Sequence, residues 1–362
     1  LKGFADRFQG GLQQMGRDSV RGLKRALEDD FQVPELSRGG RLAERLVLPA
    51  IAQFTRMGYN RSTKHWNPVS RWMGDKHVVI TGASAGLGLA AAHRLAELGA
   101  ELTLVIRNEE KAMALKQDII RASGNNRVHI ELADLSLMAD VDGLVKRLTT
   151  LNRPIDALIN NAGALFNPRG ETSEGIEQSF ALLLLSPYRL TEGLKPLLLR
   201  ASNARVVNVV SGGMYSQGLD VGRLEAPAED YAGSVAYARA KRGLMIVTEQ
   251  WAAQWADAGI VVNAMHPGWA ETPGIESALP GFHRLTRPFL RSAEQGADTM
   301  VWLATATEAA SVSGKLFLDR IPRTTHLLSS TRETSEQRAD LMNFLADYRA
   351  GAGARDLQAA PC

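Results

Sequence analysis

The chain has 362 residues, of which 22% are charged and 45% hydrophobic, and its formal net charge is only +3. This composition excludes disorder as the main state, and the length suffices for one large domain with extensions or for two small domains. No uncharged apolar run reaches the roughly 18 residues that a membrane span needs. The one cysteine, Cys362, ends the chain, so no disulfide can form within it. These observations predict a cytoplasmic globular protein.

The basic charge is concentrated before the predicted domain. Residues 1–76 hold 14 Lys/Arg against 8 Asp/Glu, whereas the rest of the chain carries a net charge of −3. Residues 1–74 therefore form a basic extension, and apolar residues recur along it at helical spacing (Phe4, Phe8, Leu12 and Met15; Leu23, Leu27 and Phe31; Leu46, Val47, Ala50, Ile51 and Phe54). Two interpretations stay open: the helices pack on the domain or a partner subunit, or residues 1–64 contact a membrane surface. No run of five basic residues occurs, so nucleic-acid binding is not expected.

From His77 onward, short β-branched runs alternate with helix-length stretches. Strands are predicted at 77–80, 102–106, 128–132, 155–160, 205–210, 260–265 and 314–318, and helices at 85–98, 109–122, 137–149, 174–200, 236–258 and 292–307. Alternation at this spacing requires parallel strands with right-handed crossovers. The sequence therefore predicts a doubly wound, Rossmann-type α/β sandwich of three layers over residues 75–330. A C-terminal helix and tail follow at 331–362.

A glycine-rich segment stands between the first predicted strand and the first predicted helix. Thr81-Gly-Ala-Ser-Ala-Gly-Leu-Gly88 places Gly82, Ser84, Gly86, Leu87 and Gly88 at this turn. Glycine lets the backbone turn tightly and approach a pyrophosphate, which rests on the positive end of the helix. A tight strand–helix turn favours glycine without any ligand, but the flanking strand and helix favour a dinucleotide site.

The residues after the second strand indicate which dinucleotide binds. A site for an unphosphorylated ribose offers Asp or Glu at this position, whereas this chain has Arg107 and Asn108. A guanidinium pairs bidentately with a 2′-phosphate. We therefore expect NADP(H) rather than NAD(H), the structural alternative being a solvated arginine at a strand end.

Further motifs follow in a fixed order along the chain. Asp134 lies in Ala-Asp-Leu135, Asn160-Asn-Ala-Gly163 follows the fourth strand, and Ser211, Tyr237-x-x-x-Lys241 and Pro267-Gly268 come later. With the glycine turn, their order and spacing resemble the short-chain dehydrogenase/reductase family. Finer matches at 210–214, 265–274, 279–283 and 319–327 look like the subfamily called dehydrogenase/reductase SDR family member 12, and residues 54–59 are similar to that subfamily's leader.

The resemblance implies roles for several of these residues. Asp134 and Leu135 would bind the adenine, and Asn161 with Gly163 would steady the sheet beside the adenine ribose. Tyr237 and Lys241 would bind the nicotinamide ribose, and Thr272 would hold the carboxamide. Pro267-Gly268 would frame the nicotinamide face.

The chemistry of the predicted catalytic residues follows from their types. Reduction of a carbonyl needs a proton for the developing alkoxide, and a tyrosine phenol with a pKa of about 10 is a weak acid for this purpose. Lys241 stands four residues after Tyr237, on the same helix face, where its charge would lower the phenol's pKa. Ser211 would donate a hydrogen bond to the substrate oxygen. Separately, each has a structural explanation: a half-buried aromatic, a solvated cation and a helix cap.

One residue departs from the family pattern. Leu183 stands where the family usually has an Asn that belongs to a water-mediated proton relay and holds a helix bend open. Two functions therefore stay open. The first is an NADP(H)-dependent oxidoreductase acting on an alcohol or carbonyl, expected to be lipophilic. The alternative is an NADP-binding sensor or membrane-surface scaffold with weak or lost catalysis, which Leu183 and the basic extension would suit.

The remaining polar residues suggest little further chemistry. Tyr231 has Val235 four residues later, so it lacks the lysine partner of Tyr237. The seven histidines show no spacing typical of zinc ligands, and His266 is interpreted as structural or pocket-lining rather than as a base. Met214 and Trp269 are candidate walls of an apolar pocket, and 212–234 is expected to be a substrate-side loop. A homo-oligomer through the helices at 174–200 and 236–258 is consistent with the resemblance.

Overall fold

The computed structural model describes residues 53–69, 72–271 and 286–348. Within them, eight strands form one sheet in the order β3-β2-β1-β4-β5-β6-β7-β8. The strands are β1 (His77–Thr81), β2 (Glu101–Ile106), β3 (Val128–Leu132), β4 (Ala157–Asn160), β5 (Arg205–Val209), β6 (Val261–Met265), β7 (Leu316–Leu318) and β8 (Ile321–Arg323). β1 to β7 pair in parallel, which confirms the predicted doubly wound sheet.

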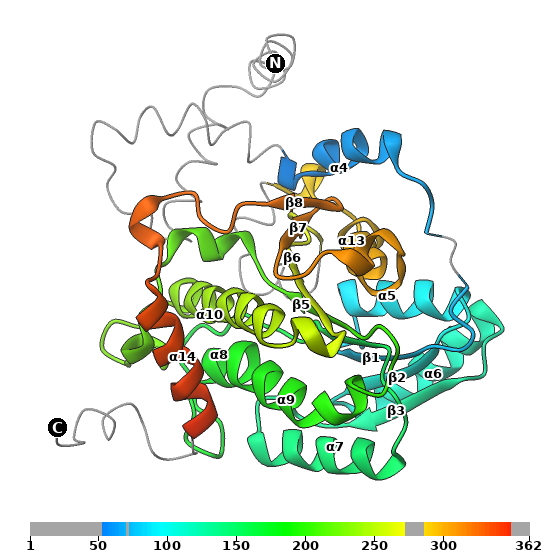
Figure 1. Ribbon diagram of the computed structural model, residues 1–362, viewed down its shortest axis with the longest axis horizontal. Coiled ribbons are helices and arrows are strands. Elements are labelled where there is room, and N and C mark those ends of the chain that lie inside the picture. The colour runs from blue at the N-terminus through cyan, green and yellow to red at the C-terminus, as the bar shows by residue number, and fades with distance from the viewer. Residues whose placement is uncertain (1–52, 70–71, 272–285, 349–362) are drawn as a thin grey trace.

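Helices cover both faces of this sheet (Figure 1). One face carries α5 (Gly86–Glu97), α6 (Glu109–Ser123) and α13 (Ala293–Thr305), and the other carries α7 (Met138–Leu151), α9 (Ser186–Leu198) and α10 (Gly233–Gln254). Each helical layer closes a separate apolar core against the sheet. Burial on both sides explains why the central strands are almost continuously apolar.

Three further helices lie outside the two layers described above. The helices α4 (Arg56–Ser62) and α14 (Ser335–Asp347) lie before and after the sandwich, and α8 (Gln178–Phe180) leads into a π-helical turn at Ala181–Leu185. A capping box of Thr334 and Gln337 starts α14. Phe344 and Tyr348 then pack on Phe180, with ring centroids 5.7 and 5.1 Å away.

Two details differ from the sequence prediction. The stretch predicted as one helix over 174–200 is α8, the π-helical turn and α9 in succession. Pro187 has no N–H, so the carbonyl of Leu183 lacks its α-helical donor, and the π-helical turn lies just before this proline. The antiparallel strand β8 was not predicted, because it has three residues and a proline in its middle.

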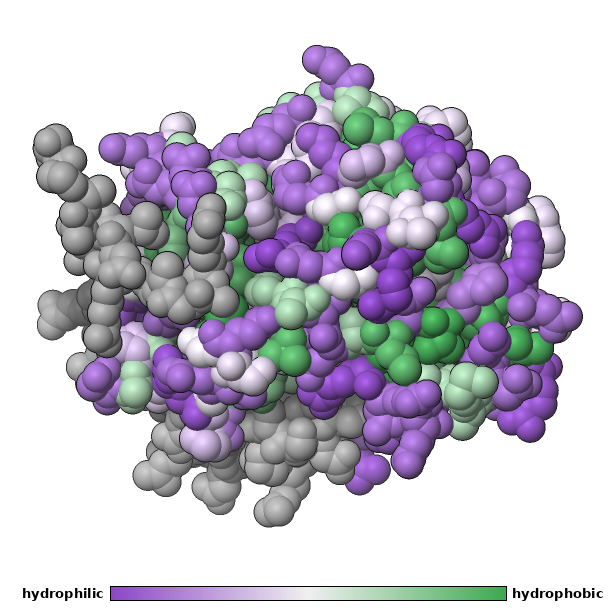
Figure 2. Space-filling view, turned by 90° about the horizontal axis from the view of Figure 1, so that it is seen from below, coloured by the Kyte–Doolittle hydropathy of each residue, from purple (hydrophilic) through white to green (hydrophobic). Residues whose placement is uncertain are grey.

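The described residues on the face seen in Figure 2 form no single large apolar patch. In the view of Figure 2, hydrophobic residues are scattered in small groups among hydrophilic ones, which is typical of folded proteins. Among the helices within 53–69, 72–271 and 286–348, none combines the length and apolar character needed to cross a membrane. The basic extension before residue 53, with its expected helices, lies outside the described residues.

Trp251 is the largest fully buried side chain, and it joins α10 to α9. Its ring stacks on Tyr188 at 5.7 Å and on Trp255 at 5.1 Å, and its indole N–H donates to Glu192 at 2.5 Å. Trp251→Ala should lower the free energy of unfolding by about 3–5 kcal/mol, because it leaves a cavity and an unpaired carboxylate. Urea denaturation would measure this loss. Met113→Ala, at an exposed site on α6, should change stability by less than about 0.5 kcal/mol, and an equal loss in both variants would contradict the prediction.

Candidate active site

The glycine turn joins β1 to the start of α5. Gly82 and Gly86 have φ angles of +67° and +54°, a region that disfavours other residues. A Cβ on Gly88 would lie 2.3 Å from the carbonyl oxygen of Gly82 and 2.5 Å from Asn161 Nδ2. The turn is therefore closely packed against Asn161, and its backbone lies at the N-terminus of a twelve-residue helix. This arrangement fits a dinucleotide pyrophosphate.

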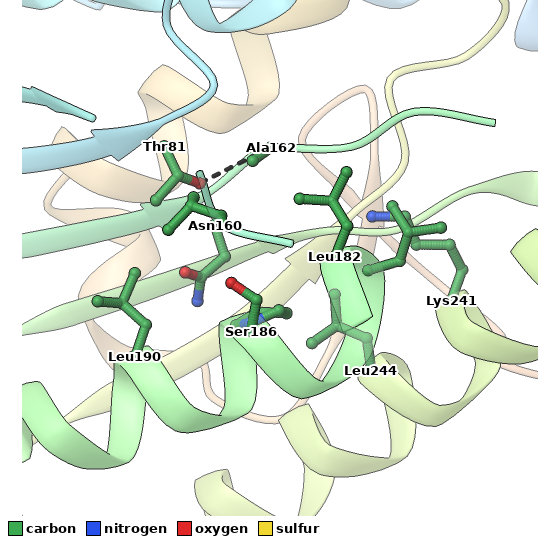
Figure 3. Close-up of a pocket in the computed structure, with 11 residues that line it drawn as sticks. Thr81, Asn160, Ala162, Leu182, Ser186, Leu190, Lys241 and Leu244 are labelled. Atoms are coloured by element: carbon green, nitrogen blue, oxygen red, sulfur yellow. Dashed lines mark hydrogen bonds between the residues drawn. The ribbon is translucent and has the colours of Figure 1, made fainter. Parts of the chain in front are cut away.

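Asn161 and Thr81 hold this turn in place from the neighbouring strand. Asn161 Nδ2 donates to the carbonyl oxygens of Thr81 and Gly82 at 3.0 and 3.1 Å. The hydroxyl of Thr81 accepts from the backbone N–H of Asn161 and of Ala162, both at 3.0 Å; Figure 3 draws the second bond. The bonds therefore connect the ends of β1 and β4.

The expected phosphate-binding residues follow β2. The Arg107 side chain is 75% exposed, and its Nη1 lies 3.5 Å from Asp134 Oδ2. Burial raises the pKa of the Asp134 carboxyl, but hydrogen bonds from Ser136 and the charge of Arg107 outweigh this effect and lower it overall. The side chain of Asn108 accepts from the backbone N–H of Lys111 at 2.9 Å and so caps α6. Arg107 therefore presents a guanidinium beside the predicted adenine residue, and the side chain of Asn108 caps the helix that follows.

Ser211, Tyr237 and Lys241 lie together at the carboxyl end of β5. Ser211 follows that strand, and Tyr237 and Lys241 lie one turn apart on α10. Ser211 lies close enough to the Tyr237 phenol to influence its pKa, and Lys241 Nζ lies 5.9 Å from the centroid of the Tyr237 ring. Burial raises the pKa of the Tyr237 phenol, and the neighbouring Ser211 hydroxyl opposes the rise. The direction differs from the expected lowering, because burial outweighs every lowering influence on this phenol.

Lys241 is buried and bonded to the strand. Its Nζ donates to the carbonyl oxygen of Val209 at 2.7 Å, and burial lowers the pKa of its ammonium to about 7. A cavity of about 10 Å³ lies beside it, at the lower limit of space for one water. Figure 3 shows Leu182 and Lys241 at one end of this cavity and Asn160 and Ser186 towards the other.

Leu183 forms part of the same cavity wall. It is fully buried, and a Cβ on Gly163 would lie 3.1 Å from its side chain and 3.7 Å from Lys241 Nζ. The resemblance implied that losing Asn at this position removes the bonds that hold the helix bend. The π-helical turn is nevertheless present at Ala181–Leu185, and Pro187 supplies a physical reason for it.

The two residues predicted to line an apolar substrate pocket, Met214 and Trp269, differ in their exposure to solvent. Met214 is fully buried, and its carbonyl oxygen accepts from Arg242 Nη2 at 3.0 Å, so its side chain belongs to the core. Trp269 is partly exposed at the end of β6. Tyr231 donates to the carbonyl oxygen of Phe166 at 2.9 Å, which fits a structural role. Thr272 lies outside the described residues.

Sequence reasoning missed two buried arginines near the site. Arg242, next to Lys241, donates to the carbonyl oxygens of Met214, Gln217 and Thr325, and thereby ties the loop after Ser211 to α10. Arg291 pairs with Asp319 behind Pro267-Gly268. Nothing in the local sequence distinguishes these arginines from solvated ones.

The fold and the grouping of Ser211, Tyr237 and Lys241 beside a dinucleotide-type turn define a class of oxidoreductase. The family model described as short chain dehydrogenase matches residues 76–280. The chain belongs to the short-chain dehydrogenase/reductase family, as the resemblance predicted.

Named relatives agree with this assignment. Dehydrogenase/reductase SDR family member 12 of Homo sapiens is 37% identical over 288 residues, which cover 79% of this chain and 90% of that protein. Retinol dehydrogenase 13 of Homo sapiens is 30% identical over 67% of this chain and 76% of that protein. Among solved structures, L-sorbose reductase from Gluconobacter frateurii, complexed with NADPH and L-sorbose, aligns with a TM-score of 0.57. It shares 23% identity over 69% of this chain and 96% of that chain.

The buried ammonium of Lys241 should make stability depend on pH. Its pKa in the folded chain, about 7, lies below the ordinary value of 10.5, so above about pH 7 the unfolded chain holds more protons than the folded one. The melting temperature of the wild type should therefore rise relative to that of Lys241→Met between about pH 7 and pH 9. Lys146→Met, at an exposed lysine on α7, controls for the lost charge. Parallel pH profiles for the wild type and Lys241→Met would contradict the prediction.

Proposed function

We propose that this chain is an NADP(H)-dependent oxidoreductase that interconverts an alcohol and a carbonyl on a lipophilic substrate. The observation that carries the proposal is the grouping of Ser211 and Tyr237 at the end of β5, with Lys241 one helical turn away. These side chains meet at the carboxyl ends of parallel strands, where open α/β sheets bind their ligands.

The glycine turn and the residues around it would hold the cofactor. The backbone at Gly82, Ser84, Gly86, Leu87 and Gly88 would face the pyrophosphate. The adenosine half would contact Arg107, Asp134, Leu135, Asn161 and Gly163, and Tyr237, Lys241 and Thr272 would contact the nicotinamide half. A nicotinamide dinucleotide supplies or accepts the hydride when it is bound.

The chain's own residues would handle the proton. In reduction, Tyr237 Oη would give its proton to the carbonyl oxygen as that oxygen becomes an alkoxide, and in oxidation it would take the proton back. Ser211 would donate a hydrogen bond to the same oxygen and so stabilise its developing charge. The raised pKa of Tyr237 keeps the phenol protonated near neutral pH but makes it a weaker acid, so the phenolate needs stabilisation when the proton leaves. As a cation, Lys241 would stabilise the phenolate that remains.

Two observations support the choice of NADP(H) and of a lipophilic substrate. Arg107 stands at the end of β2 with an exposed guanidinium, and the ribose-binding Asp or Glu of NAD sites is absent from that position. The retinol dehydrogenase among the relatives acts, by its name, on a lipophilic alcohol. Trp269, partly exposed beside the site, would contribute apolar surface.

The cofactor preference is tested by binding. Titration of the wild type with NADPH and with NADH should give tighter binding of NADPH, and Arg107→Ser should weaken NADPH binding about tenfold or more while leaving NADH binding unchanged. The reason is that the lost guanidinium pairs only with the 2′-phosphate. Arg121→Ser removes another exposed arginine, on α6, and should change neither affinity. Tighter binding of NADH by the wild type would overturn the NADP(H) assignment and keep the enzyme class.

The catalytic assignment is tested by turnover. Tyr237→Phe keeps the ring and removes the acidic hydroxyl, so NADPH-dependent reduction of apolar aldehydes and ketones should fall by about 100-fold or more. Loss of NADPH absorbance measures the rate, and the same titration should still find NADPH bound, about tenfold weaker at most because a single contact to the nicotinamide half is lost. Tyr231→Phe removes a hydroxyl from the neighbouring loop and should retain turnover. Equal rates for the wild type and Tyr237→Phe would exclude this residue as the proton donor.

A further inference from the structure

A segment that precedes the first strand lies against the candidate active site. We call residues 53–69 the leader segment; it includes α4, which Figure 1 places near the ends of β7 and β8. The carbonyl oxygen of Phe54 accepts from the backbone N–H of Trp269 at 2.7 Å and from Arg291 Nε at 3.0 Å. Trp269 follows the Pro267-Gly268 pair that the resemblance places at the nicotinamide face. The start of the leader segment is therefore bonded directly to the loop after β6.

Arg291 forms hydrogen bonds to both the leader segment and the loop after β6. Its side chain is 2% exposed and forms a bidentate ion pair with Asp319, at 2.6 and 2.9 Å. The same guanidinium donates to the carbonyl oxygens of Gln53, Phe54 and Pro267. A buried arginine satisfied in this way has little freedom to move, because each displaced bond would leave a desolvated polar group.

Gly268 shows how closely the leader segment approaches the loop. Its φ angle is +76°, and a Cβ there would lie 2.4 Å from Arg291 Nε and 2.7 Å from the carbonyl oxygen of Phe54. The leader segment, Arg291 and the loop after β6 are therefore packed directly against one another.

The ring of Phe54 continues the contact towards the catalytic serine. It packs edge-on against the imidazole of His266, with ring centroids 4.7 Å apart, and tilted against Trp269 at 6.2 Å. His266 Nδ1 accepts from the backbone N–H of Gly268 at 3.3 Å, which places the ring proton on Nε2. A Cβ on Gly212, the residue after Ser211, would lie 2.8 Å from that Nε2.

We propose that Phe54 is a positioning residue of the active site, which acts through His266 and Trp269 on the Pro267–Gly268 loop and on the backbone beside Ser211. The leader segment thereby determines the geometry of the nicotinamide and substrate end of the site. It leaves the adenosine end unchanged, since the Phe54 contacts described above are all with the loop after β6 and with Arg291. This inference rests on the proposed function.

Other contacts anchor the rest of the leader segment and provide a matched control. The rings of Trp66 and Tyr59 pack edge to face, with their centroids 5.5 Å apart. The guanidinium carbon of Arg320 lies 4.4 Å from the centroid of the Trp66 ring. Arg320 is paired with Asp298 on α13. Trp66→Leu therefore loosens the same segment at a different point, without removing a contact of Phe54.

The test compares whole dinucleotides with fragments that lack nicotinamide. Isothermal titration of the full chain with NADPH and with 2′-phospho-ADP-ribose separates the two halves of the cofactor site, and steady-state kinetics separate kcat from KM. In Phe54→Ala, we expect kcat to fall about tenfold or more and NADPH to bind more weakly, with 2′-phospho-ADP-ribose bound as in the wild type. Phe54→Tyr keeps the ring, so its kcat and its NADPH affinity should be close to those of the wild type. Trp66→Leu should lower the melting temperature and leave both values near those of the wild type.

The possible outcomes are separable. Phe54→Leu nearly keeps the side-chain volume and replaces Phe54→Ala if the alanine variant fails to fold, with the same expectations. A normal kcat and a normal ratio of the two affinities in the Phe54 variants would overturn this inference and leave the proposed function intact. Equal effects of Trp66→Leu and Phe54→Ala would also overturn it, because general loosening would then explain both. A wild type that binds neither NADPH nor NADH would overturn the proposed function and this inference together.

Discussion

Parallel pairing of β1 with both β2 and β4 is the constraint on which the candidate site depends. It brings the carboxyl ends of these strands to one edge of the sheet, and the strand order reverses direction at β1. Thr81 ends β1 at this edge, and its hydroxyl bonds the backbone after β4. The glycine turn, Arg107 and Ser211 then follow the ends of β1, β2 and β5 at the same edge. Residues more than one hundred positions apart are thus assembled by backbone pairing before any side-chain chemistry is considered.

Buried cations give this edge its rigidity. Lys241, Arg242 and Arg291 are each almost fully removed from solvent; Lys241 donates to a backbone carbonyl oxygen at the end of β5, and the two arginines donate to those of neighbouring loops. Burying a cation is unfavourable unless it is paired or hydrogen-bonded, so these bonds hold the loops in defined positions. The arginines act as fixed supports, whereas burial brings the pKa of Lys241 close to neutral, where its charge responds to its surroundings.

Local patterns predicted the sheet and most of its helices because both depend on short-range periodicity of apolar residues. They also marked Ser211, Tyr237 and Lys241, which the fold brings into contact. Leu183 was expected to remove the bonds that hold the helix open at this point. A π-helical turn is nevertheless present there, next to Pro187. The sequence also did not reveal that Asn108 caps α6, because an asparagine can serve either as a helix cap or as a cofactor ligand.

The sequence by itself determined the order of the parallel strands and their helices, the glycine turn and the candidate catalytic side chains, because these follow from periodicity and motif spacing along the chain. Only the tertiary structure decided that Met214 is core, that Arg291 is buried and that Phe54 lies against His266. Each of these facts depends on contacts between residues far apart in sequence. Burial and electrostatic environment arise from such contacts, so no local pattern could have specified them.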